Sequence, residues 1–377
     1  MSGKLTPEFV IQYTKFATGI TFVWPPSSKA SRLSEITFKI GWWVSWILCV
    51  VIVLSLFRTA YNHRDNFMQL TETLSTAACL LQVMTKMVVG KCHYNRLQYL
   101  IHEMETFVEN ANFHEREILT NYIKRIVSFH FVYHTLCAIL ATFYIFGPFL
   151  MDQPLPFGAE YPFCIDEHPA YDIVYLLESI GGIQCSCIIA FICQVSLLLW
   201  YGTIQLAFLA EKMRNVNNTQ QLKECISKHQ HILRYIDEIT KIVRYMVMTA
   251  IVVAMISVTC SGIHIVGKEN IIRRIQFLLV VIVDGLELLC LAWAAENLSA
   301  ASKEVGWALY SSTWIKHSKE LNKTVIFVIQ RCQTPPKIAI GGLLPQLSMN
   351  YYGRYMSTMY SFFTTLRVML KKFEDDV

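Results

Sequence analysis

The chain has 377 residues, of which 54% are hydrophobic and only 16% are charged. A soluble domain usually carries about 25% charged residues, so the composition argues against a soluble protein and for a membrane protein. The net charge is a mild +5, and Lys and Arg are scattered along the chain, which makes a nucleic-acid partner unexpected.

Long apolar segments predict an all-α membrane protein with seven spanning helices, since one span requires about 20 mostly apolar residues. In chain order, the predicted spans are Ile36–Phe57, Phe67–Val89, Ile126–Leu150, Ile173–Leu199, Tyr245–Val266, Ile275–Ala295 and Leu343–Leu370. Leu321–Ile329 is too short to cross a bilayer and is predicted as a half helix before the last span. Three parts follow: an N-terminal segment 1–35, a six-span body 36–318, and a C-terminal part 319–377 with the half helix and the last span.

The distribution of Lys and Arg predicts the orientation. They are frequent in the N-terminal segment and in the loops after spans two, four and six, whereas Met151–Asp172 has none and is acidic. Cytoplasmic loops carry an excess of Lys and Arg, so we expect a cytoplasmic N-terminus and an extracellular C-terminus. The loop after span five, with Lys268, Arg273 and Arg274, is the exception.

The loop after span four is predicted to be helical. Its apolar residues recur at helical spacing, which indicates helices that continue from the membrane into a cytoplasmic anchor layer. These residues are Leu222, Ile226, His229, Ile232, Leu233, Ile236 and Ile239.

No motif for an enzyme is present: neither a Gly-rich phosphate loop, nor HExxH, nor GxSxG. We therefore expect no catalytic residue and no cofactor. His130 and His134 lie one turn apart in span three, as two metal ligands on one helix face would. The sequence assigns them no further His or Cys partner, so a packed role is favoured and no metal is predicted.

Charged residues inside the spans are costly and are candidates for function. Asp284 and Glu287 share one face in the middle of span six and must point into the bundle or into a wet cavity. Either structural pairing or contact with a ligand or ion would explain them. Lys86 is expected to extend to the inner interface, and Glu72 and Glu178 to lie in water near the outer ends.

The last span carries a polar face. Tyr351, Arg354, Thr358, Ser361 and Thr365 recur at steps of three and four residues, which places them on one side of a helix. Such a face must contact protein or water rather than lipid. A water-filled path between several copies and hydrogen bonding between helices of one bundle are both consistent with this periodicity.

The C-terminal residues resemble insect odorant receptors. GGLLPQLS from Gly341 to Ser348, with MYSFFTTLR from Met359 to Arg367, is similar to the family ending "pLS…sYSyftlLr". The resemblance implies an odour-gated, non-selective cation channel: a heterotetramer with the odorant receptor co-receptor in the plasma membrane of sensory neuron dendrites. The compact loop Glu211–Arg244 is typical of the odorant-binding rather than the co-receptor subunit.

The resemblance also assigns site residues. It places the pore constriction at Thr365 and Met369, with Thr358 and Ser361 lining the approach. It places a small, largely uncharged volatile ligand in the outer halves of spans two, three, four and six, where no Lys or Arg can be located. Core packing is the alternative for these apolar surfaces. The predicted ligand contacts are Leu74, Thr142, Ile145, Phe146, Ser179, Ile183, Phe277 and Val281.

Three other functions were weighed. Gustatory receptors end in a Thr-Tyr and Gln-Phe pattern, from which Ser361-Phe362 and Val368-Met369 both depart. A G-protein-coupled receptor predicts an external N-terminus and an Asp-Arg-Tyr-type triplet after span three, and the loop there has no Arg. A transporter predicts repeated halves with broken helices, and no repeat is visible.

Overall fold

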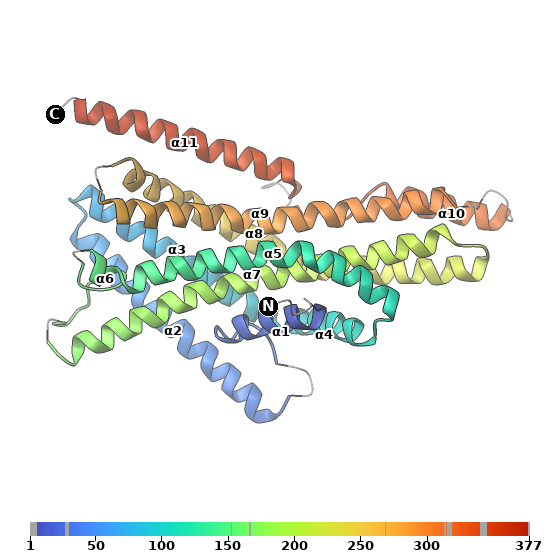
Figure 1. The fold of residues 1–377 in the computed structure, drawn as a ribbon, viewed down its shortest axis with the longest axis horizontal. Helices are drawn as coiled ribbons and strands as arrows, with labels where there is room; N and C mark the ends of the chain where they lie inside the picture. Colours follow the sequence, from blue (N-terminus) through green and yellow to red (C-terminus); the bar gives the residue numbers. More distant parts are fainter. Residues whose placement is uncertain are drawn as a thin grey trace.

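The computed structural model describes residues 6–375 except 27–29, 152, 166, 268, 313, 315–318 and 340–344. The described residues form helices and no strand (Figure 1). The helices are α1 Pro7–Gly19, α2 Arg32–Asn62, α3 Phe67–Cys92, α4 Tyr94–Asn110, α5 Phe113–Ile145, α6 Gly147–Leu150, α7 Ala170–Arg214, α8 Thr219–Val266, α9 Ile271–Tyr310, α10 Lys319–Cys332 and α11 Met349–Asp375.

Six of the described helices are long and apolar enough to cross a membrane: α2, α3, α5, α7, α8 and α9. They contain the first six predicted spans, except that the third, Ile126–Leu150, extends beyond the end of α5 at Ile145. The seventh predicted span corresponds to α11, which has 27 residues and is more polar. A helix of that length extends over about 40 Å, more than the roughly 30 Å of a hydrocarbon core. The prediction of an all-α membrane protein is confirmed.

Three helices are much longer than the spans predicted within them. α7, α8 and α9 have 45, 48 and 40 residues, or about 60 to 70 Å each. Their extensions, together with α4 and α10, form a helical layer at one end of the molecule (right in Figure 1). The anchor layer predicted from the helical spacing in the loop after span four is therefore present, and Leu222, Ile236 and Ile239 are buried in it.

Two helices were not predicted. α1 begins at Pro7 after Thr6, whose hydroxyl accepts the Phe9 N–H as an N-terminal cap, and it packs against α4, α5 and α7. α4 carries buried residues at helical spacing from Leu97 to Val108. The prediction of span three was also too long at its outer end, because α5 ends at Ile145 and a separate short helix, α6, follows.

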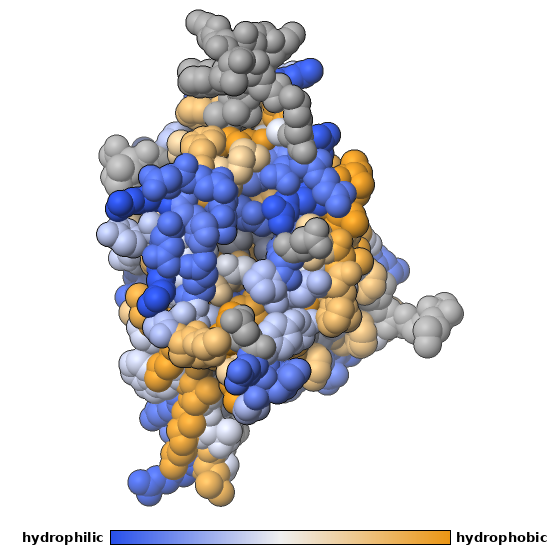
Figure 2. Space-filling view, turned by 90° about the vertical axis from the view of Figure 1, so that its left-hand side faces the viewer, coloured by the Kyte–Doolittle hydropathy of each residue, from blue (hydrophilic) through white to orange (hydrophobic). Residues whose placement is uncertain are grey.

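α7 is the central helix. Every residue from Ile188 to Leu206 is buried, and α7 packs against α5, α8 and α9 along much of its length. A helix that is apolar on all sides is typical of a bundle core. α2 is peripheral and exposes Trp43, Val44 and Leu54, as lipid contact requires. Seen from the α6 end, the surface is hydrophilic across the middle and on the left, and hydrophobic along much of its right edge and part of its downward projection (Figure 2).

Candidate functional site

A small, partly open cavity lies between four membrane-spanning helices. Its walls come from α3, α5, α7 and α9, and Phe157 from the loop before α7 contributes to one end, which is the outer end in the orientation predicted from the sequence. Its volume is about 70 Å³, less than the roughly 150 Å³ apolar cavity that holds benzene in another protein. Its walls must therefore move before an organic ligand fits. Most of the lining is apolar, with Leu80, Leu140, Ile189 and Val283 among the contributors.

A buried carboxylate holds the loop that closes the outer end. Glu178, near the start of α7, is fully buried. Its two oxygens accept hydrogen bonds from the Phe157 backbone N–H at 2.7 Å and from the Tyr161 hydroxyl at 3.1 Å. The expectation that Glu178 lies in water was wrong, because the loop between α6 and α7 folds over it. The carboxylate thus fixes Phe157 against the cavity.

Two glycines allow this close packing on α7. A Cβ atom on Gly181 would lie 2.7 Å from Ile52 and 3.3 Å from Phe157. One on Gly182 would lie 3.3 Å from Ile145. The pair lets α2, α5 and the loop approach the backbone of α7 where the cavity closes.

A charged group occupies the inner end of the cavity. The Lys86 ammonium lies 2.7 Å from Glu287, whose same oxygen accepts a hydrogen bond from Gln82 at 2.8 Å. Lys86 and Glu287 are each 2% exposed. The expectation that Lys86 extends to the membrane interface was wrong: the pair is satisfied inside the bundle, because α3 and α9 face each other there. Asp284, one turn before Glu287, lines the same cavity.

The structure is consistent with both roles considered for Asp284 and Glu287, namely structural pairing and contact with a ligand or ion. Glu287 is paired, yet both carboxyl groups line the cavity. Within the described residues, one oxygen of each, Asp284 Oδ2 and Glu287 Oε1, has no hydrogen-bond partner. The cavity therefore offers hydrogen-bond acceptors to a ligand or water at one end and apolar walls elsewhere.

None of the eight predicted ligand contacts is among the residues that line the cavity. Phe277 is fully buried, but its ring stacks on His264 with centroids 4.3 Å apart. Thr142, Phe146 and Ile183 are exposed on the outside of the subunit. The remaining four are partly buried: Leu74, Ile145, Ser179 and Val281. Of these, Ile145 packs against the cavity-lining Gly182.

The four spans predicted to hold the ligand are nevertheless the four helices that surround the cavity. The predicted residues lie on other faces of these helices than the residues that line it. The sequence contains a signal for the face that does line it, namely the charged residues of span six. Val280, Asp284 and Glu287 lie at steps of four and three residues and share one face of α9, and all three line the cavity. Taking the face of the buried charges, rather than the outermost aromatic residues, would have located it.

The polar face of α11 points away from the rest of the subunit from Arg354 to Thr365, whereas Tyr351 at its start packs against the core. Tyr355 and Met359 are buried where α11 packs against α8 and α9, whereas Thr358, Ser361 and Thr365 are exposed. The Thr358 and Thr365 hydroxyls donate to backbone carbonyls of their own helix, at 3.0 and 2.9 Å. The side chain of Met369 lies outside the described residues. The exposed hydroxyls are available to other subunits or to water.

Comparisons with known proteins agree with this fold. The chain aligns with the insect olfactory receptor OR5 from Machilis hrabei in complex with eugenol, with a TM-score of 0.77 and 14% identity, over 95% of this chain and 98% of that one. The same receptor in a second structure gives a TM-score of 0.78.

Curated relatives are odorant receptors. Odorant receptor Or2 of Anopheles gambiae is 21% identical over 61% of this chain and 65% of its own length. Odorant receptor 10 of Aedes albopictus is 22% identical over 61% and 64%. The chain thus spans less than two thirds of these two, whereas Odorant receptor 23a of Drosophila melanogaster aligns over 86% of this chain and 89% of its own length, at 22% identity.

The model of the 7tm odorant receptor family matches residues 66–360, most of the chain. This match favours that family over the gustatory, G-protein-coupled and transporter alternatives. The chain belongs to the 7tm odorant receptor family.

Proposed function

We propose that this chain is the odorant-binding subunit of a heteromeric, odour-gated, non-selective cation channel that assembles with the odorant receptor co-receptor. The observation that carries the proposal is the small, mostly apolar cavity between α3, α5, α7 and α9 in a chain of this family. A mostly apolar cavity with a few polar groups is the usual form of a small-molecule site.

The ligand in this proposal is a small, uncharged volatile. The related OR5 was solved in complex with eugenol, a small organic molecule. In the present cavity the one cation, Lys86, is already paired with Glu287, and Asp284 adds a second carboxyl group. An anionic ligand would lack a free partner there. A neutral molecule with one hydrogen-bond donor fits the walls and the unpaired carboxyl oxygens.

The conduction path in this proposal runs along α11. Thr358 and Ser361 line its approach, and Thr365 and Met369 form the constriction. The support is the exposed hydroxyl face of α11 beside a buried face that packs against α8 and α9. A polar face on a membrane-spanning helix needs protein or water, and the same helix from the other subunits around an axis would supply both.

The orientation follows the charge distribution, with the helical layer on the cytoplasmic side of the plasma membrane. One of the positive charges that run against this orientation has partners in the structure. Arg273 lies 3.2 Å from Glu72 and 3.8 Å from Glu269, so its charge is balanced at the outer end. Glu72 is therefore an ion-pair partner rather than a merely wet carboxylate.

Recording odour-evoked current tests the proposal. The chain is expressed alone and with the co-receptor in cells, a broad panel of volatiles is applied, and surface expression is measured in both. We expect robust current only with the co-receptor and only for part of the panel. Equal currents without the co-receptor, at equal surface expression, would exclude the heteromeric channel.

A further inference from the structure

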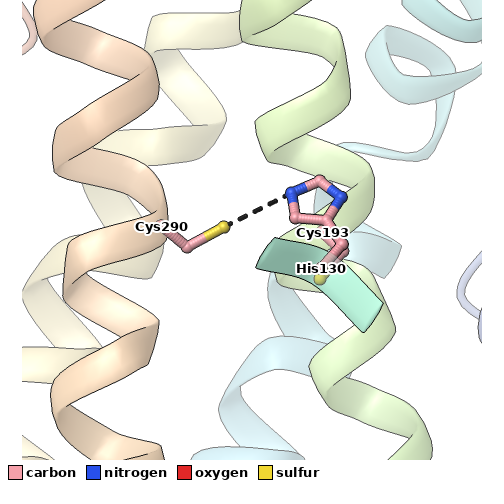
Figure 3. A group of neighbouring side chains, drawn as sticks. All are labelled: His130, Cys193 and Cys290. Carbon is pink, nitrogen blue, oxygen red and sulfur yellow. Dashed lines mark hydrogen bonds between the residues drawn. The ribbon is translucent and has the colours of Figure 1, made fainter. Parts of the chain in front are cut away.

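A buried group of one histidine and two cysteines lies among the three helices α5, α7 and α9. His130, Cys193 and Cys290 are 5%, 1% and 0% exposed. Their ligand atoms all lie within 4.8 Å of one another. Figure 3 shows the side chains converging from separate helices, with the His130 ring facing Cys290. The group is distinct from the cavity, whose lining includes none of the three.

The histidine is aimed into this group. Its Nε2 lies 3.6 Å from the Cys290 sulfur and 3.3 Å from the Ser196 hydroxyl. Within the described residues, its Nδ1 has no partner, so the polar contacts of the ring converge on Nε2. His134, the other member of the pair seen in the sequence, contacts the Tyr13 hydroxyl at 3.3 Å instead. The ligand partners that the sequence did not assign to His130 come from α7 and α9.

The separation of two of the ligand atoms matches a metal site. Zinc binds histidine nitrogen at about 2.0–2.1 Å and cysteine sulfur at about 2.3 Å, which at a tetrahedral angle places the two atoms about 3.6 Å apart. This is the distance found between His130 Nε2 and Cys290 Sγ. Two thiolates and one imidazole are preferred zinc ligands, and the Ser196 hydroxyl lies 3.3 Å from the His130 nitrogen.

We propose that His130, Cys193 and Cys290 form a structural zinc site inside the membrane-spanning bundle. The charge balance favours a divalent ion such as zinc over a cuprous ion. An isolated charge in a low-dielectric interior is very costly. A divalent ion with two thiolates and a neutral imidazole sums to zero, whereas a cuprous ion would leave one negative charge. The nearby carboxyl groups Asp284 and Glu287, which outnumber Lys86, make that excess negative charge still less favourable.

The zinc would join three of the four walls of the cavity at its inner end. Ile189 and Glu287, which line the cavity, lie about one turn before Cys193 and Cys290 along their helices. A bound ion would therefore fix the relative positions of α5, α7 and α9 where the charged group lies. We therefore expect removal of the metal to lower the thermal stability of the whole subunit, and not only to free one side chain.

Metal counting on the purified full-length chain tests the site. The protein is expressed with added zinc, purified under reducing conditions with and without the co-receptor, and analysed by mass spectrometry for bound metals. The variants are Cys193→Ser and Cys290→Ser, with Cys260→Ser as a matched control, since Cys260 is a buried thiol on α8 outside the group. A second measurement replaces zinc with cobalt and records thiolate-to-cobalt charge-transfer absorption.

We expect about one zinc per chain in the wild type and in Cys260→Ser. Affinity should fall by more than tenfold in each ligand variant, because even outer-sphere changes cost about 10–100-fold. A chelator should lower the apparent melting temperature of the wild type and leave Cys290→Ser unchanged. If the ligand variants fail to fold, the metal count and cobalt spectrum of the wild type decide. A metal-free wild type, copper in place of zinc, or a Cys193–Cys290 disulfide in non-reduced peptides would overturn the proposal.

Discussion

At the scale of single residues, Glu178 fixes the loop that closes the cavity. It is fully buried and accepts two hydrogen bonds, from Phe157 and Tyr161. Glu178→Ala leaves a buried N–H without an acceptor, which costs about 1–3 kcal/mol. We expect a lower melting temperature of the purified chain and a weaker, less selective odour response.

Two milder variants serve as controls for Glu178. Glu178→Gln keeps one carbonyl oxygen as an acceptor, and Tyr161→Phe removes one hydrogen bond only. Both should fall between wild type and Glu178→Ala in melting temperature. If Glu178→Ala melts and responds like the wild type, the loop is held by other contacts.

The Lys86–Glu287 pair gives a second prediction at this scale. Lys86→Met leaves the buried Glu287 carboxylate with Gln82 as its one described partner, and breaking a buried pair costs about 3–5 kcal/mol. We expect a marked loss of folded receptor, measured by size-exclusion fluorescence and thermal unfolding.

Adding Glu287→Gln to Lys86→Met should recover much of the loss, because no unpaired charge is then buried and Gln82 keeps an oxygen acceptor. Glu287→Gln alone also leaves a buried charge without its partner, on Lys86, so it should destabilise the receptor as well. A double variant as unstable as Lys86→Met would show that lost packing of the Lys86 side chain, and not the unpaired charge, causes the effect.

At the scale of elements, α11 presents two different faces. Thr358, Ser361 and Thr365 are exposed, and Met359 is buried against the subunit. We predict that cysteines at the three exposed positions react with a small charged thiol reagent applied from outside during odour exposure. Reaction should change the current there and spare Met359→Cys and Phe363→Cys. Modification confined to the last two would mean that the other face of α11 lines the path.

The constriction itself can be tested by changing its polarity. Hydrophobic rings close pores by dewetting, whereas hydroxyls favour water. Thr365→Val should therefore raise the odour concentration needed for opening, and Met369→Ala should lower it. Neither should change the order of preference among odorants, since the cavity lies elsewhere. A changed preference order would place Thr365 in ligand recognition.

At the scale of the whole molecule, the cavity depends on the mutual placement of four helices. Leu140→Ala on α5 and Val283→Ala on α9 remove apolar contact from its walls. Losing about 40 Å² of contact costs about 1 kcal/mol, or roughly a fivefold increase in the half-maximal odour concentration. Larger odorants should lose less, or gain, because the enlarged cavity admits them.

The residues predicted from the sequence provide the comparison. Phe146→Ala and Ile183→Ala alter side chains that are exposed on the subunit. A ligand in the cavity predicts little change in these variants and a clear shift in Leu140→Ala and Val283→Ala. The opposite pattern would place the odorant in the outer, surface-facing region predicted from the sequence.

The sequence determined the class of protein and its elements. Long apolar segments were sufficient to predict six membrane-crossing helices, because crossing a bilayer requires about 20 mostly apolar residues. The helical spacing of the apolar residues around Ile236 and Ile239 predicted that helix continues outside the apolar span of α8. The polar periodicity from Arg354 to Thr365 predicted the exposed hydroxyls of α11, although Met356 and Tyr360 on other sides of the helix are exposed as well. α1 escaped prediction because it is short and stabilised by packing against α5 and α7.

The tertiary structure alone decided which faces meet. α7 is apolar on all sides, so its periodicity cannot say which side contacts α5 and which contacts α9. Lys86 and Glu287 lie 201 residues apart, and His130 meets Cys193 and Cys290 from two other helices. Such contacts depend on the rotation and depth of each helix in the bundle. These are fixed by the packing of all the helices together, not by the local pattern of any one of them.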